Sequence, residues 1–254
     1  MSAEPCPAAL GCRYPESVSA VASGPTGSEF GAVLAGVSPT LEADHPRLRG
    51  WLHLGTFFGS LATGAVLIPL AAVQGAGHGF AVAIYCLTVS LLFGTSALYH
   101  RRSWSTRSWL IMKRLDHSMI FIFIAGSYTP FAVLALNPGS DVAILTTAWV
   151  GAVAGVLLKM SWPGAPRWLG VPIYIALGWV AVFVLPQVLA NTGVTALILL
   201  CVGGGLYTFG GIVYATRWPN PSPAVFGYHE VFHACTVVAA ICHYIAVYFV
   251  IYAT

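Results

Sequence analysis

The sequence predicts an all-α membrane protein built as a seven-transmembrane helix bundle. This prediction rests on the composition and on the pattern of long uncharged runs. Hydrophobic residues make up 57% of the 254 residues and charged residues only 7%, whereas a soluble domain carries roughly a quarter charged residues. The mean hydropathy is +0.80. Long uncharged runs recur along the chain, each close to the about 20 residues that a helix needs to cross a bilayer. We therefore expect a multi-pass protein of the cell membrane.

Residues 1–45 differ from the rest because they are rich in Pro, Gly, Ser and Ala. They lack the basic start and apolar core of a signal peptide. This composition is typical of a disordered tail, so residues 46–254 are expected to form the transmembrane domain.

Seven uncharged runs predict the membrane-spanning helices. The runs cover about 50–73, 79–100, 115–136, 142–160, 168–189, 194–215 and 229–252. Turn-like stretches such as "QGAGHG", "LNPGSD" and "RWPNPSP" separate neighbouring runs. Residues 168–216 contain no charged residue and are too long for one crossing, and "LPQVLANTG" provides the break.

Lys and Arg predict the orientation, since they concentrate on the cytoplasmic side of membrane proteins. With seven spans, all basic residues precede the first span or lie in the connections on that same side: Arg13, Arg47, Arg49, Arg101, Arg102, Arg107, Lys113, Arg114, Lys159, Arg167 and Arg217. The N-terminus is therefore expected in the cytoplasm and the C-terminus outside. This topological role also accounts for the net charge of +3, which gives no indication of nucleic-acid binding.

The predicted topology brings polar residues from three helices to one membrane depth. These residues are Ser96 and His100 at the end of the second span, Asp116 and His117 at the start of the third, and His229 and His233 at the start of the seventh. Residues four apart share a helix face, so His229 and His233 can bind one ion. Three histidines with one open position are typical of a catalytic zinc site.

Other polar residues have less specific interpretations. Isolated histidines at helix ends, namely His45, His53 and His78, are expected at the membrane interface. Neighbours on a helix point about 100° apart, so His117 is not expected to face the same ion as Asp116. By the same argument Glu230 points away from His229 and is expected to be solvated.

Two residues are candidates for the wall of a cavity beside the metal. His243 lies fourteen residues after His229, which places it about 21 Å deeper on nearly the same helix face. It is too far away to join the same ion, and it either forms a hydrogen bond within the bundle or lines a cavity. Tyr128, in "AGSYTPF", is a weaker candidate, because that stretch is also explained by close helix packing and a proline kink.

Three ordered motifs resemble one family. "SALYH", "RLDHSMIFIFIAGSYTP" and "HEVFHACTVVAAICHY" are similar to the signature segments of the PAQR family, which includes adiponectin receptors and bacterial hemolysin-III-type proteins. The resemblance covers about residues 45–252. It implies zinc held near the cytoplasmic surface by His100, His229 and His233, with Asp116 interacting through a zinc-bound water and Ser96 as the motif serine. It also implies kinship with membrane hydrolases such as alkaline ceramidases.

Three functions remain open from the sequence. The first is a zinc-dependent hydrolase of a lipid amide or ester, with Asp116 as base, Ser96 as hydrogen-bond donor and a membrane lipid as substrate. The second is a membrane sensor or receptor in which zinc only holds helices together. The third is a pore-forming hemolysin or a transporter, which the scarcity of polar groups in the outer halves of the helices disfavours.

Overall fold

The computed structural model describes residues 46–162, 164 and 166–253. The predicted tail and His45 lie outside these residues. Within the described ranges every regular element is a helix, apart from an isolated bridge between Ser222 and Phe226. The fold class is therefore confirmed as all-α.

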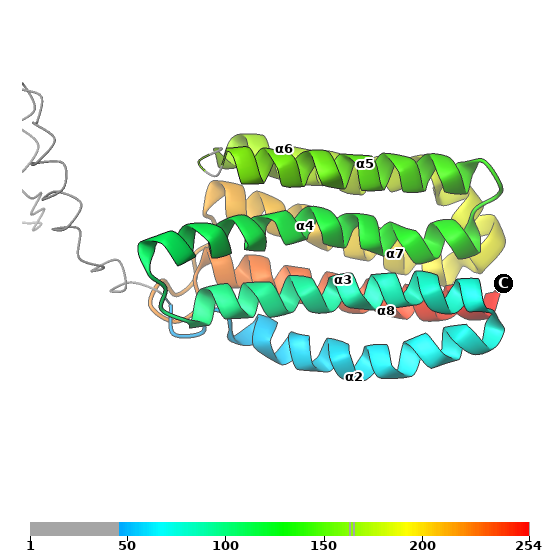
Figure 1. The fold of residues 1–254 in the computed structure, drawn as a ribbon, viewed down its shortest axis with the longest axis horizontal. Helices are drawn as coiled ribbons and strands as arrows, with labels where there is room; N and C mark the ends of the chain where they lie inside the picture. Colours follow the sequence, from blue (N-terminus) through cyan, green and yellow to red (C-terminus); the bar gives the residue numbers. More distant parts are fainter. Residues whose placement is uncertain (1–45, 163, 165, 254) are drawn as a thin grey trace, which may run out of the picture. The chain divides into compact units, whose positions relative to one another are not determined.

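The helices lie side by side along one direction (Figure 1). In chain order they are α2 (Trp51–Gln74), α3 (Ala76–Arg101), α4 (Thr106–Ala135), α5 (Ser140–Ser161), α6 (Arg167–Trp179), the 3₁₀ helix η2 (Val180–Val184), α7 (Leu185–Thr216) and α8 (Tyr228–Ala253). Six helical stretches in the described residues are long and apolar enough to cross a membrane, with 167–216 forming one of them. A helical membrane bundle is thus supported directly.

The stretch 167–216 is not one straight helix. Its 50 residues would extend about 75 Å as a continuous α-helix, more than twice the thickness of the hydrocarbon core. The helix tightens at η2 and then loses helical geometry at Gly193, with φ 82° and ψ 175°, a conformation that is essentially restricted to glycine. Gly193 belongs to the "LPQVLANTG" segment in which the sequence predicts a break. In Figure 1, α6 runs alongside α5 and the later part of α7 returns along the bundle.

Small residues bring neighbouring helices close together. A side chain at Gly126 of α4 would overlap Thr88 of α3, so this glycine sets the distance between the two helices, as the "AGSYTPF" segment predicts. One hydrophobic core lies among α2, α3, α4, α7 and α8, and a second lies among α4, α5 and the α6–η2 region. Helix α4 contributes to both cores and joins the two parts of the bundle.

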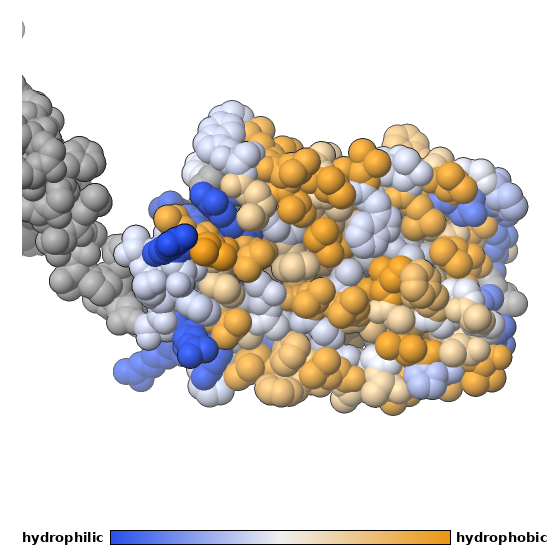
Figure 2. Space-filling model, in the orientation of Figure 1, coloured by the Kyte–Doolittle hydropathy of each residue, from blue (hydrophilic) through white to orange (hydrophobic). Residues whose placement is uncertain are grey.

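The ends of the bundle differ in polarity from its middle. Figure 2 shows hydrophobic side chains over the middle of one face. Hydrophilic side chains gather most strongly at the end where α3 connects to α4. The connections α5–α6 and α7–α8 reach this same end (Figure 1), which we call the basic end because it carries the basic residues of these connections.

Candidate metal centre and cavity

Three histidines from two helices meet at the basic end. His100 comes from the last turn of α3, and His229 and His233 come from the first two turns of α8. One ring nitrogen from each lies within 4.8 Å of the others. The Nε2 atoms of His100 and His229 are 3.2 Å apart, and the rings of His229 and His233 have centroids 4.4 Å apart. The sequence-predicted ligands are therefore brought together.

The donor set fits a metal ion such as zinc. Zinc binds imidazole nitrogen at about 2.0–2.1 Å with tetrahedral geometry, which puts two ligand nitrogens roughly 3.3 Å apart. The 3.2 Å between the Nε2 atoms of His100 and His229 agrees with that spacing for one pair, while the three nitrogens together lie within 4.8 Å of one another. Three imidazoles leave a fourth position open, as in catalytic zinc sites.

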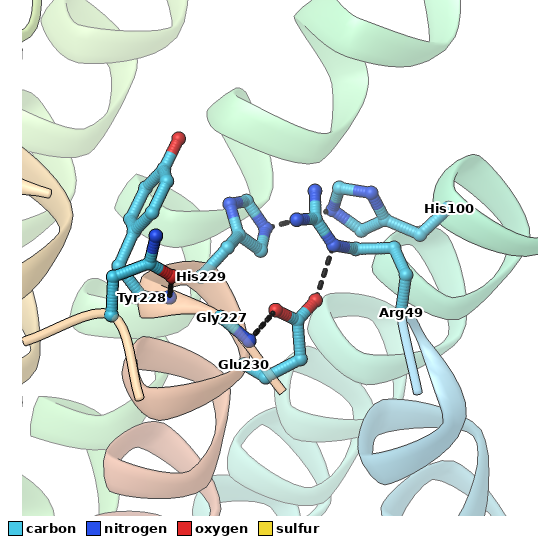
Figure 3. Close-up of polar contacts among 7 residues, drawn as sticks. Arg49, His100, Gly227, Tyr228, His229 and Glu230 are labelled. Carbon is cyan, nitrogen blue, oxygen red and sulfur yellow. Dashed lines mark hydrogen bonds and ion pairs between the residues drawn. The ribbon is translucent and has the colours of Figure 1, made fainter. Parts of the chain in front are cut away.

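The first turn of α8 is held by an ion pair that the sequence did not predict. Glu230 pairs with Arg49, and its other carboxylate oxygen accepts a hydrogen bond of 2.8 Å from the backbone N–H of Gly227 (Figure 3). A carboxylate that reaches back to an unpaired N–H at a helix start stabilises that start. The expectation that Glu230 is solvated is wrong, because only 1% of Glu230 is exposed.

The chain before α2 is also tied to the loop before α8. The backbone N–H groups of Arg47 and Leu48 donate to the carbonyl groups of Ala224 and Val225, at 3.1 and 3.2 Å. These bonds bring Arg49 to Glu230 and to the histidine cluster (Figure 3). Two segments far apart in the sequence thus set the position of His229 together.

A fourth histidine belongs to this neighbourhood. His53 of α2 is 3% exposed and stacks on His233, with ring centroids 3.7 Å apart. Neither of its ring nitrogens has a hydrogen-bond partner of ordinary geometry in the described part of the chain, although the ring lies close to the His233 backbone. His53 is therefore not an isolated histidine on the surface of the bundle. The sequence did hold a signal for this contact. His53 lies near the start of the first predicted span, and the predicted topology places the starts of the first and seventh spans at the same membrane depth.

Asp116 and Ser96 lie beside the cluster but outside the group of three histidines. Both side chains line the same cavity as His229 and His233, and they interact with each other. His117 also lines this cavity, and its Nδ1 donates to the carbonyl of Lys113 at 2.8 Å. The same Nδ1 lies 3.6 Å from the Asp116 carboxylate, and the Nε2 lies 3.4 Å from the Tyr214 hydroxyl. Both ring nitrogens of His117 therefore have partners outside the group of three histidines.

A cavity of about 230 Å³ extends from the histidines along the inside of the bundle. Its wall is mostly apolar and continues to Phe131, Val184 and Val188. Both residues predicted for the wall, Tyr128 and His243, line it. The Tyr128 hydroxyl also donates to the carbonyl of Gly178 at 2.6 Å and accepts from the N–H of Ala181 at 2.8 Å. Tyr128 therefore fixes the junction of α6 and η2 as well.

Residues 41–244 match the sequence model of the family described as Haemolysin-III related. The "Hemolysin-3 homolog" of Bacillus subtilis (strain 168) is 29% identical over 131 residues, covering 52% of this chain and 61% of that protein. "Hemolysin-3" of Bacillus cereus is 29% identical over 147 residues, covering 56% and 67%. "Progestin and adipoQ receptor-like protein 1" of Caenorhabditis elegans is 25% identical over 181 residues, covering 65% and 41%.

The fold and the site define a multi-pass helical membrane protein with a candidate three-histidine metal centre. Because the family model matches well over half of the chain, the protein belongs to the haemolysin-III related family. The predicted resemblance to PAQR and hemolysin-III-type proteins is confirmed, and so is the expected place in the cell membrane. The match spans about three fifths of the Bacillus subtilis relative.

Proposed function

We propose that the protein is a zinc-dependent hydrolase that cleaves an amide or ester bond of a membrane lipid and serves membrane homeostasis. The observation that carries this proposal is the position of the histidine cluster at one end of a largely apolar cavity. Asp116 and Ser96, which can act on a bound carbonyl group, line that same end. A metal centre that only joined helices would not need a cavity beside it.

The proposed topology has seven crossings with the basic end in the cytoplasm. The break at Gly193 and the return of α7 along the bundle support a division of 167–216 into two crossings. The basic residues at the ends of α3, α5 and α7 support a cytoplasmic position of this end, because Lys and Arg favour the cytoplasmic side. The N-terminus would then be cytoplasmic, the C-terminus outside and the cluster at the inner leaflet.

Each residue at the cluster has a proposed role. His100, His229 and His233 would hold zinc, which when bound polarises a carbonyl group and makes water acidic enough to ionise near neutral pH. Asp116 accepts the proton of the attacking water, and the Ser96 hydroxyl donates a hydrogen bond to the developing oxyanion. The apolar wall holds the hydrocarbon part of the lipid and keeps bulk water out.

Access for a lipid is supported by the outer wall of the cavity. Trp179 and Val182 of the α6–η2 region and Cys201 of α7 line the cavity and are exposed. We infer that the cavity reaches the lipid-facing surface between α6–η2 and α7. A substrate could enter there sideways from the bilayer, with its polar group toward the basic end.

The second candidate is a membrane sensor or receptor with a structural metal. The observation that favours it is that the histidines come from α3 and α8, so that an ion would link these two helices. The resemblance to a nematode protein whose name describes it as receptor-like agrees with this candidate.

Asp116→Asn separates the two candidates. A hydrolase loses turnover when its base is removed but keeps its metal, since Asp116 is not one of the three ligands. Metal content and a screen of lipid amides and esters would be measured on wild type, Asp116→Asn and His229→Ala. Metal in the wild type with no turnover of any lipid would contradict the hydrolase and leave the structural role; wild type without metal would contradict both.

A further inference from the structure

Two polar side chains face the cavity far from the histidine cluster. The hydroxyl of Tyr207 on α7 and both ring nitrogens of His243 on α8 are buried and have no hydrogen-bond partner of ordinary geometry in the described part of the chain. Both residues line the cavity. One side of the His243 ring lies close to the Leu200 backbone, but the contact falls outside the geometry of an ordinary hydrogen bond.

Apolar packing holds this pair in place. The rings of Tyr207 and His243 meet edge to face, with centroids 5.3 Å apart. Phe123 packs on Tyr207 at 5.7 Å and Phe131 lies 6.5 Å from His243. A side chain at Gly203 would overlap the His243 ring, so this glycine makes room for the imidazole. The two positions are thus set by their surroundings rather than by a polar contact between them.

Leaving these groups unpaired is costly. A buried hydroxyl or imidazole without a partner destabilises a protein by about 1–3 kcal/mol, and polar groups within membrane-spanning helices are usually functional. Native proteins satisfy nearly all buried polar atoms. A bound group that supplies the missing hydrogen bonds would explain why the pair is present.

The chemistry of the pair selects that group. A neutral imidazole offers one donor and one acceptor, and a phenol hydroxyl offers both. A hydroxyl group also donates and accepts, so it can accept from the Tyr207 hydroxyl and donate to the acceptor nitrogen of His243, whereas a carbonyl oxygen can bond only to the donors. We propose that Tyr207 and His243 form a subsite for a hydroxyl group carried on the hydrocarbon body of a lipid. We call this pair the deep subsite.

The helix sets the position of that hydroxyl on the ligand. His243 follows His233 by ten residues, which corresponds to a rise of about 15 Å along α8. One cavity connects both regions, so a single ligand can occupy them. The lipid therefore carries its hydroxyl in mid-chain, well away from the group that meets the histidines. This inference rests on the proposed use of the cavity by a lipid, but it does not depend on hydrolysis.

Competition binding tests the deep subsite. Three probes displace labelled stearate from purified protein: stearate, stearate with a mid-chain hydroxyl, and stearate with a hydroxyl beside the carboxyl group. One added hydrogen bond should make the mid-chain compound bind about two- to tenfold tighter than stearate in the wild type. Tyr207→Phe should abolish this preference while stearate itself still binds, and His243→Leu should do the same.

Tyr244→Phe is the matched control. Its hydroxyl already donates to the carbonyl of Thr63, and it does not line the cavity, so the preference should persist. An equal affinity of the wild type for all three probes would overturn the deep subsite, as would an unchanged preference in Tyr207→Phe. Failure of stearate to bind at all would overturn the lipid-filled cavity and the deep subsite together. Tyr207→Phe alone decides the outcome if His243→Leu does not fold.

Discussion

The two polar regions of the cavity are built in opposite ways. At the basic end the histidines face one another, and a buried ion pair and backbone hydrogen bonds fix the start of α8. In the deep subsite, mainly packing places Tyr207 and His243, and their polar atoms have no hydrogen-bond partner of ordinary geometry in the described chain. The first region could thus hold an ion in fixed geometry, whereas the second is the region for which we propose a ligand hydroxyl.

The largest expected effect tests which histidines belong to the ion. His100→Ala should reduce metal in the purified protein from about one ion per chain to almost none, because two imidazoles alone bind zinc weakly. His117→Ala should retain the metal, since the Nδ1 of His117 is directed to the carbonyl of Lys113. Elemental analysis after chelator-free purification measures both. Equal metal content in the two variants would contradict the assignment of His100, and not His117, as a ligand.

The second effect concerns the ion pair that anchors α8. Glu230→Gln leaves Arg49 without its partner in a site where the glutamate is 1% exposed, and breaking such a buried pair costs about 3 kcal/mol. The thermal unfolding midpoint in detergent should fall. The double variant Arg49→Met/Glu230→Gln should recover part of the loss, because no unpaired charge remains. A double variant that is no more stable than Glu230→Gln would refute this account.

A third effect addresses the packing of the deep subsite. Gly203→Ala adds a methyl group that would overlap the His243 ring and lie 3.2 Å from the carbonyl oxygen of Ala239. The substitution should therefore destabilise the protein by about 1–3 kcal/mol. Gly205→Ala is the matched control on the same helix, because nothing lies within 4 Å of the added carbon. That control should be neutral or slightly stabilising. Unfolding midpoints of the two variants should differ in that direction, and equal midpoints would contradict the packing.

The smallest effect concerns His53, which lies beside the histidine cluster at the basic end. Its ring nitrogens, like the polar atoms of the deep subsite, lack hydrogen bonds of ordinary geometry. His53→Phe keeps an aromatic ring stacked on His233 and removes two buried nitrogens without hydrogen bonds. Metal content should stay at the wild-type level and stability should change by less than about 1 kcal/mol. Loss of metal in this variant would make His53 a ligand and merge it with the histidine cluster.

The arrangement within single helices could be predicted from the sequence. Four-residue spacing puts His229 and His233 on one face, and the alternation of basic connections brings His100 to the same depth. The break near Gly193 follows from a long uncharged stretch with turn residues in its middle. These features depend on local periodicity and on membrane thickness, and both can be read from one sequence.

Contacts between helices could not be predicted in the same way. Arg49 and Glu230 are 181 positions apart, and nothing in the local pattern of either indicates the other. The stacking of His53 on His233 likewise requires α2 and α8 to be neighbours. Adjacency of helices depends on how whole surfaces pack, so sequence spacing placed Glu230 in solvent and gave His53 no neighbour on another helix.

The hydrogen bonds between the segment before α2 and the loop before α8 join an early part of the chain to a late one. This end of the bundle can therefore be completed only late in synthesis. The histidine cluster draws on α3 and on α8, the last described helix, so a chain emerging from the ribosome cannot assemble it until α8 has been synthesised and inserted. If the cluster binds an ion as proposed, uptake of that ion would mark a completed bundle. A nascent chain arrested before residue 228 would be a membrane protein without the three-histidine cluster.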